Sequence, residues 1–284
     1  MATFYNQATL SYNGNTTTSN ITTGELVEVL SATKTAVQTE YQQDDTLTYV
    51  VNILNSGNTT MTGVTISDNL GAYTLNALTL VPMDYVVGTV RYYVGGVLQP
   101  TPTVTAGPPL TISGLSVPAK GNVTVIYQAK TNDYAPLAQE SSITNTATIN
   151  ANNIANPITA SATVNAYGEP VLRISKSLTP TTVSENGQLT YTFIIQNYGN
   201  NTADETDALI VSDRFDPILN PITVAFNGTA WTEGTEYTYD ATTGQFISTA
   251  GAITVPAASY TQDSATGAIS IVPGSATLTI TGTV

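Results

Sequence analysis

Three kinds of polar side chain recur at matching places in this chain and together have the chemistry to form a covalent bond. Each is in phase with alternate apolar residues, and side chains two apart on a β-strand share a face. Each is therefore predicted to point into the core of a β-sandwich. The members are Lys34, Asp68 and Asn145 in one set and Lys176, Asp213 and Asn6 in the other.

A buried charge costs several kcal/mol unless it is compensated, so a core-facing lysine needs an explanation. One explanation is an ion pair of lysine with aspartate, completed by a hydrogen bond from asparagine. The other is an isopeptide bond. Burial lowers the pKa of an amine and raises that of a carboxylic acid. A neutral Lys34 amine can then attack the Asn145 amide while Asp68 shuttles the proton and ammonia leaves.

Taken singly, each residue has a simpler interpretation. A lysine on a strand often protects an edge or extends to water. An aspartate after a strand often begins a turn, and so does an asparagine. The joint recurrence in phase favours the covalent interpretation, in which Asp68 and Asp213 are the catalytic carboxyl groups.

The elements that must position these residues are predicted to be strands. Apolar residues alternate with polar ones, and turn residues arrive every eight to twelve positions, which is typical of an all-β sandwich. Two blocks repeat the pattern Lys, Leu-Thr-Tyr, Asn-x-Gly-Asn and Ser-Asp. We expect two tandem immunoglobulin-like sandwiches. Domain 1 covers residues 23–166 and domain 2 covers residues 167–284, after an N-terminal extension at 1–22.

The N-terminal extension carries a strand that resembles one from the middle of the chain. Residues 4–10 match residues 143–149, the strand that is predicted to close domain 1. Val117–Val125 also matches Val272–Ile280. By this alignment domain 2 ends before its own copy of the closing strand. We therefore expect a donor strand at the front and a vacancy in domain 2. The donor side chains are Phe4, Asn6, Ala8 and Leu10.

Composition excludes several classes of function. The chain has 284 residues, a formal net charge of −13, and no histidine or cysteine. Thiol, zinc-finger and histidine-triad chemistry are therefore excluded. The negative charge argues against binding to nucleic acid. No segment is long and apolar enough for a transmembrane helix. We expect no metal, no cofactor, no nucleic-acid partner, no membrane insertion and no enzymatic activity on an outside substrate.

The repeated motifs look like a known family. Lys34, Leu47-Thr48-Tyr49, Asn55-Ser56-Gly57-Asn58, Ser67-Asp68 and Asn145-Thr146-Ala147-Thr148 together resemble the repeat of long bacterial and archaeal surface proteins, catalogued as domain of unknown function number eleven. The resemblance implies an immunoglobulin-like sandwich and a structural role at the cell surface. Surface proteins of Gram-positive bacteria are also similar in using lysine, asparagine and a carboxylate within such a sandwich.

These observations predict a structural subunit that polymerises head to tail with itself by donor-strand complementation. Lys34 and Asn145 are expected to bond within one chain, and Lys176 is expected to bond Asn6 of the next. The filament is expected outside the cell or on a cell or spore surface. The alternative is an adhesin or carbohydrate-binding module from a larger surface protein, with Trp231 and tyrosines as its ligand face.

Overall fold

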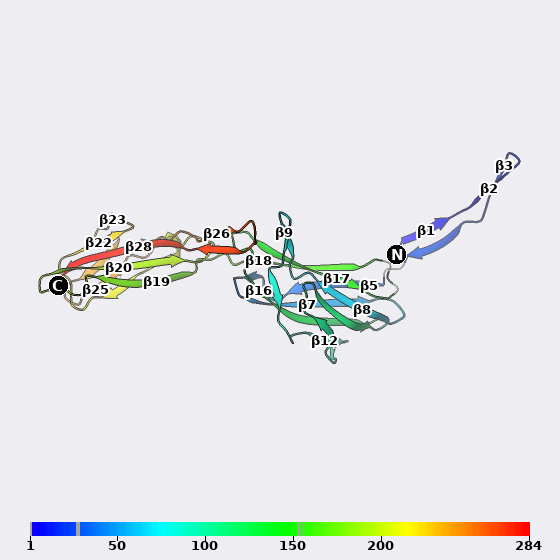
Figure 1. The fold of residues 1–284 in the computed structure, drawn as a ribbon, viewed down its shortest axis with the longest axis horizontal. Coiled ribbons are helices and arrows are strands. Elements are labelled where there is room, and N and C mark those ends of the chain that lie inside the picture. Colours follow the sequence, from blue (N-terminus) through cyan, green and yellow to red (C-terminus); the bar gives the residue numbers. More distant parts are fainter. Residues whose placement is uncertain (1, 27–28, 153, 155) are drawn as a thin grey trace.

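The chain folds into three parts arranged in a row, as the computed structural model of residues 2–26, 29–152, 154 and 156–284 shows (Figure 1). An N-terminal hairpin lies at one end, domain 1 lies in the middle and domain 2 lies at the other end. The fold is all-β, as predicted. Within the described residues the helical content is one short 3-10 turn, Glu205–Asp207, which Asp204 caps.

The N-terminal hairpin covers residues 2–26 and is exposed from residue 4 to residue 23. It replaces the single continuous strand that the sequence predicts. The outgoing strand is interrupted at Gln7–Ala8, where the Ala8 and Ser19 backbones are hydrogen bonded. The tip is the turn Asn13-Gly14, with φ of 45° and 78°, which suits an Asn-Gly hairpin turn. Two antiparallel pairs make up the hairpin: β1 (Ala2–Asn6) with β4 (Thr22–Leu26), and β2 (Thr9–Tyr12) with β3 (Asn15–Thr18).

Domain 1 is a sandwich of two six-stranded sheets around one apolar core. Alternation along its strands explains the core, since Tyr49, Val51 and Ile53 of β7 are fully buried while Asn52 is exposed. The first sheet has the order β13-β12-β16-β7-β5, with β11 also on β16, and the second has the order β14-β15-β8-β17-β18-β6. A separate pair, β9 and β10, lies beside them. The bounds are β5 (Leu30–Ala36), β6 (Glu40–Tyr41), β7 (Thr46–Asn55), β8 (Met61–Asp68), β9 (Tyr73–Leu75), β10 (Leu78–Leu80), β11 (Met83–Tyr85), β12 (Arg91–Val94), β13 (Val97–Leu98), β14 (Thr103–Thr105), β15 (Leu110–Val117), β16 (Asn122–Thr131), β17 (Ser142–Asn150) and β18 (Ile158–Ala166).

Domain 2 repeats this plan with a smaller second sheet. Its first sheet has the order β19-β20-β28-β22-β23, and its second has only β21-β25-β24. β21 corresponds to β8, so the neighbours that β17 and β18 provide in domain 1 have no counterpart among the described strands of domain 2. The bounds are β19 (Leu172–Thr179), β20 (Gln188–Asn197), β21 (Ser212–Arg214), β22 (Ile222–Phe226), β23 (Thr229–Ala230), β24 (Tyr237–Asp240), β25 (Gln245–Ser248), β26 (Ser259–Gln262), β27 (Ile269–Val272) and β28 (Gly274–Thr283).

The strand register corrects one detail of the repeat. Tyr49 lies opposite Tyr127 in domain 1, and the equivalent Tyr191 lies opposite Ile280 in domain 2. Tyr127 therefore corresponds to Ile280, whereas the sequence alignment matched Val125 with Ile280. The shift is two residues. Because side chains on a strand alternate, such a shift keeps the same residues facing the core.

Strands β26 and β27 form a hairpin that connects the two domains. The Gln262 amide donates to the Tyr73 hydroxyl, at 2.7 Å, and the Ile269 amide donates to the Asp133 carbonyl, at 2.8 Å. Tyr260 and Ile271 of the same hairpin pack against the core of domain 1. The equivalent connection in domain 1 is the short turn Pro118–Gly121, so this hairpin is an addition to domain 2.

Candidate functional site

Three strands position the lysine, aspartate and asparagine of domain 1. Lys34 lies in the middle of β5, and Asp68 ends β8. Asp68 is paired with Ala147 of β17, so Asn145 lies two residues away on the same face. All three residues are buried: Lys34 as a whole is 5% exposed, and Asp68 and Asn145 are fully covered. The predicted intramolecular set therefore meets in the core.

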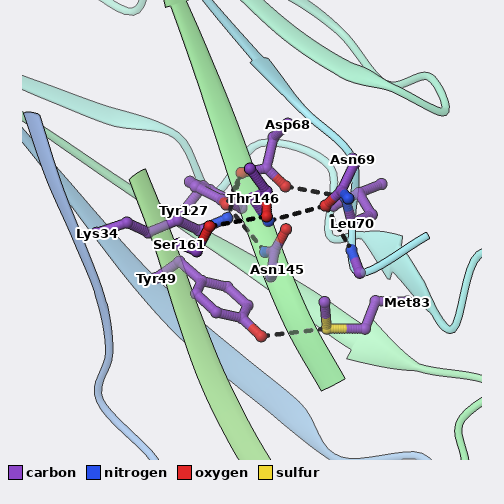
Figure 2. Close-up of polar contacts among 11 residues, drawn as sticks. Lys34, Tyr49, Asp68, Asn69, Leu70, Met83, Tyr127, Asn145, Thr146 and Ser161 are labelled. Carbon is purple, nitrogen blue, oxygen red and sulfur yellow. Dashed lines mark hydrogen bonds and ion pairs between the residues drawn. The ribbon is translucent and has the colours of Figure 1, made fainter. Parts of the chain in front are cut away.

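Asp68 is the centre of the cluster. Its Oδ2 accepts hydrogen bonds from Lys34 Nζ and from the Tyr127 hydroxyl, each at 2.5 Å, and its Oδ1 accepts one from the Leu70 amide, at 3.0 Å. Figure 2 shows these side chains converging on the carboxylate from different strands. Ion pairs this well covered are stabilised only when the remaining polar atoms are hydrogen bonded as well.

Asn145 is the member of the cluster whose side-chain oxygen lacks a hydrogen bond. Its Nδ2 donates to the Tyr127 hydroxyl at 3.3 Å, while its Oδ1 has no hydrogen-bond partner within the described part of the chain (Figure 2). A buried acceptor without a donor is unfavourable. The amide oxygen of Asn145 is therefore the group in this cluster that still has room for a hydrogen-bond donor.

Burial increases the share of neutral amine at Lys34. Burial lowers the pKa of Lys34 from 10.5 to about 8, although Asp68 acts in the opposite direction. The rings of Tyr49 and Tyr127 act in the same direction as Asp68, because an aromatic face attracts a cation. Their centres lie 4.8 Å and 5.8 Å from Lys34 Nζ. A lysine with a lowered pKa is a competent nucleophile near neutral pH.

Tyr49 and Tyr127 belong to the site, and sequence reasoning missed them. Their rings stack with centres 5.6 Å apart on paired strands β7 and β16. Burial raises the pKa of both phenols, so both stay protonated. The signal was present in the sequence, because each tyrosine is in phase with buried apolar residues and a buried tyrosine needs a partner for its hydroxyl.

The equivalent site of domain 2 holds the same ion pair but is open to solvent. Lys176 Nζ contacts Asp213 Oδ2. The two side chains are 39% and 19% exposed, whereas those of Lys34 and Asp68 are both 0% exposed. Lys176 Nζ lies 4.3 Å from the ring centre of Tyr191. Ile280 stands in the place of Tyr127, so this carboxylate lacks the phenol that Asp68 has.

The asparagine that would complete this second site lies at the other end of the molecule. Asn6 is exposed on β1, with domain 1 between it and domain 2 (Figure 1). The other predicted donor residues, Phe4, Ala8 and Leu10, are exposed as well. The structure of one chain therefore brings Lys176 and Asp213 together and leaves Asn6 apart from them.

An apolar groove lies beside the open site in domain 2. Its volume is about 170 Å³. In domain 1, Leu30 is 7% exposed, whereas its counterpart Leu172 is 38% exposed, and Ile174 and Ile210 are each 57% exposed. The groove is lined by Leu172, Arg173, Ile174, Ile195, Leu209, Ile210, Val211 and Ile253.

Trp231, which the alternative adhesin hypothesis placed on an exposed ligand face, is half-buried. Its ring packs on Phe226 with ring centres 5.3 Å apart, and it adds to the core of domain 2. Across the described residues, no helix has the length and apolarity needed to cross a membrane.

Comparison with known proteins finds similarity of strand arrangement at low sequence identity. The full-length major pilin RrgB of Streptococcus pneumoniae is 14% identical over 88% of this chain and 42% of that chain, with a TM-score of 0.37. BcpA, the major pilin subunit of Bacillus cereus, is 12% identical over 96% of this chain and 73% of that chain, with a TM-score of 0.38. A transglutaminase of red sea bream is 13% identical over 87% of this chain and 31% of that chain, with a TM-score of 0.30.

No protein-family profile and no curated sequence matches the chain. The chain spans about half, 55%, of the pilus backbone structure from Streptococcus pneumoniae. At such low identities and TM-scores, these neighbours support no conclusion about this chain, and its function rests on its own residues.

Proposed function

We propose that this protein is the structural subunit of a surface filament, assembled head to tail from copies of itself. The observation that carries the proposal is the contrast between the two Lys–Asp sites. The site of domain 1 is sealed by β17 with its Asn145, while the site of domain 2 is open and lacks an asparagine among the described residues. Asn6 of a second copy supplies that asparagine.

The N-terminal strand of one copy adds to the free edge of β21 in the next. β8 is hydrogen bonded on both sides, to β15 and β17, while β21 is bonded only to β25 among the described strands. Main-chain hydrogen bonds drive addition of a strand to such an edge, and alternate side chains enter the core. By the register of β17, Ala8 lies opposite Asp213 and Leu10 lies opposite Val211.

Isopeptide bonds then lock each site. The neutral Lys34 amine attacks the Asn145 carbonyl carbon, the new C–N bond replaces the bond to the side-chain nitrogen, and that nitrogen leaves as ammonia. Asp68 donates its proton to the amide and receives the proton that the amine loses, so the carboxyl group is regenerated. Lys176, Asp213 and Asn6 of the next copy repeat this reaction between chains.

A denaturing gel of the boiled protein, together with intact mass, tests the proposal. We expect a ladder of multimers. One ammonia molecule is lost for the bond within each chain, and one more is lost for the bond at each junction between chains. Asn6→Ala and Lys176→Ala each collapse the ladder to monomers that have lost one ammonia. Asn20→Ala, on the same exposed segment, and Lys130→Ala, an exposed lysine paired with Asp44, are the matched controls and leave the ladder intact.

Two outcomes would contradict parts of the proposal. Monomers of full theoretical mass would exclude isopeptide bonds at both sites. Monomers that also show no filaments by electron microscopy at high concentration would exclude head-to-tail assembly itself.

A further inference from the structure

Among the strands that the structure describes, none gives domain 2 the cover that β17 and β18 give domain 1. In domain 1, β17 pairs with β8, and β18 pairs with β17 and lies alongside β5. Domain 2 has β19 in the place of β5 and β21 in the place of β8. The positions of both β17 and β18 are therefore open, and a single added strand would fill only the first of them.

Exposure along β19 shows what the second strand would cover. Its residues are almost all exposed, whereas Leu30 and Lys34 of β5 are buried. Ile174 is 57% exposed. It lies on β19, the strand on the opposite side of the opening from β21. A lone strand on β21 would leave Ile174 in water, whereas a strand in the place of β18 would bury it.

The β1–β4 pair of the N-terminal hairpin has the same antiparallel pairing as the first half of the β17–β18 hairpin. Asn145 pairs with Ala162 in β17–β18, and Asn6 pairs with Thr22 in the N-terminal hairpin. In the sequence, each hairpin is followed within a few residues by the first strand of the next sandwich. Aligning the two asparagines places β1 on the first half of β17, β2 on the half of β17 that pairs with β8, and β4 on β18.

One cross-strand pair supports this equivalence, because two aliphatic residues in domain 1 correspond to one aromatic residue and one glycine in the hairpin. Ile143 faces Val164 in β17–β18, and Phe4 faces Gly24 in the N-terminal hairpin. The Phe4 ring lies directly over Gly24, where an added Cβ would be 2.2 Å from Cζ of the ring. The bulk that two aliphatic side chains supply in domain 1 is supplied by one aromatic ring in the hairpin.

We infer that the whole N-terminal hairpin, not one strand of it, docks into domain 2 of a second copy, with β2 on β21 and β4 beside β19. The inference rests on the proposed head-to-tail assembly and names the surface that mediates it. The partner is a second copy of this chain, because the hairpin and the opening match as β17–β18 matches domain 1. Each hairpin thus completes the sandwich of one copy while it begins domain 1 of its own.

The first test places a charge where only the return strand would bury it. Ile174→Asp should reduce assembly roughly 100-fold or more, because a carboxylate would be buried without a partner. Ile194→Asp is the matched control, since Ile194 is 39% exposed on β20 and faces away from the core. Light scattering and electron microscopy follow assembly, and circular dichroism confirms that each monomer is folded.

The second test uses the pair across the hairpin. Gly24→Val should slow assembly at least ~10-fold, because the new side chain collides with the Phe4 ring inside a hairpin that must fit a closed opening. Adding Phe4→Ile recreates the Ile143/Val164 pair and should restore assembly. Thr23→Val, on the outward face of β4, is the control without effect.

The outcomes separate this inference from the function on which it rests. If the wild-type chain forms no filaments, the proposed assembly fails. If the wild-type chain assembles, yet Ile174→Asp assembles like Ile194→Asp, a single strand is donated and the hairpin inference is wrong. Faster assembly by Gly24→Val would also contradict docking of the whole hairpin, because single-strand donation needs β1 to leave β4.

Discussion

Lys34 is an ionisable group that folding transfers from water into a protein core. The cost falls mainly on the charged form, which is why burial lowers the pKa of Lys34 to about 8 in spite of the neighbouring Asp68 carboxylate. In the unfolded chain the same amine keeps its ordinary value of 10.5. This difference links stability to pH in any form of the protein in which the lysine stays free.

The Asn145→Ala variant has no side-chain amide with which Lys34 could form an isopeptide bond. Its free energy of unfolding should rise between pH 8 and pH 10. In this window the unfolded chain binds more protons than the folded one, so the free energy of unfolding increases with pH. Above pH 10 the effect reverses, because Tyr49 and Tyr127 have raised pKa values and the unfolded chain loses their protons first. Urea unfolding at several pH values measures this. A flat profile would contradict a free, buried Lys34.

The Tyr127 hydroxyl is the contact that distinguishes the two Lys–Asp sites at the level of single residues. It donates to Asp68 Oδ2 and accepts from Asn145 Nδ2. Domain 2 has Ile280 in this place, and no hydroxyl there supports Asp213. A bond that forms during assembly therefore begins from a less constrained pair than a bond that forms during folding.

At the scale of elements, the β26–β27 hairpin fixes the two domains to each other. Gly267 allows its close approach to domain 1. Its φ is +79°, and an added Cβ would lie 2.5 Å from Leu80 Cδ1. The side chain of Leu80 is itself buried, so it has little room to move aside.

Gly267→Ala should loosen the joint between the domains. We expect small-angle scattering to show a broader range of interdomain angles, while the melting of each domain changes little. Gly234→Ala is the matched control. It has the same backbone conformation, with φ of +84°, and an added Cβ meets nothing within 4 Å. If both variants scatter alike, backbone strain and not the contact with Leu80 explains the effect.

The sequence predicted the fold class and the meeting of Lys34, Asp68 and Asn145, because alternation determines which residues share a face. It predicted a single strand at Phe4–Leu10 because the return strand, rich in threonine, carries little apolar alternation. The sequence alignment did not detect the two-residue shift at Ile280, because an even shift preserves the pattern of inward and outward residues. Tyr127 was missed because an aromatic residue in phase with buried apolar residues resembles any other residue of the hydrophobic core.

At the scale of the whole molecule, the net charge of −13 opposes association of like copies. The contacts that we propose for the junction are apolar and main-chain in character. Added salt should therefore speed assembly between about 0.01 M and 0.15 M, as the screening length falls from about 30 Å to about 8 Å. Turbidity measured over time tests this. Slower assembly at higher salt would indicate that ion pairs across the junction dominate.

The β26–β27 hairpin also has a mechanical consequence. It reaches back from domain 2 to the domain before it, whereas domain 1 has only the turn Pro118–Gly121 in that place. In a string of copies, stiff joints with this brace would alternate with joints that lack it. Such a fibre would bend mainly at every second joint. Under shear, a covalently continuous fibre could then bend at these joints without stretching its covalent bonds.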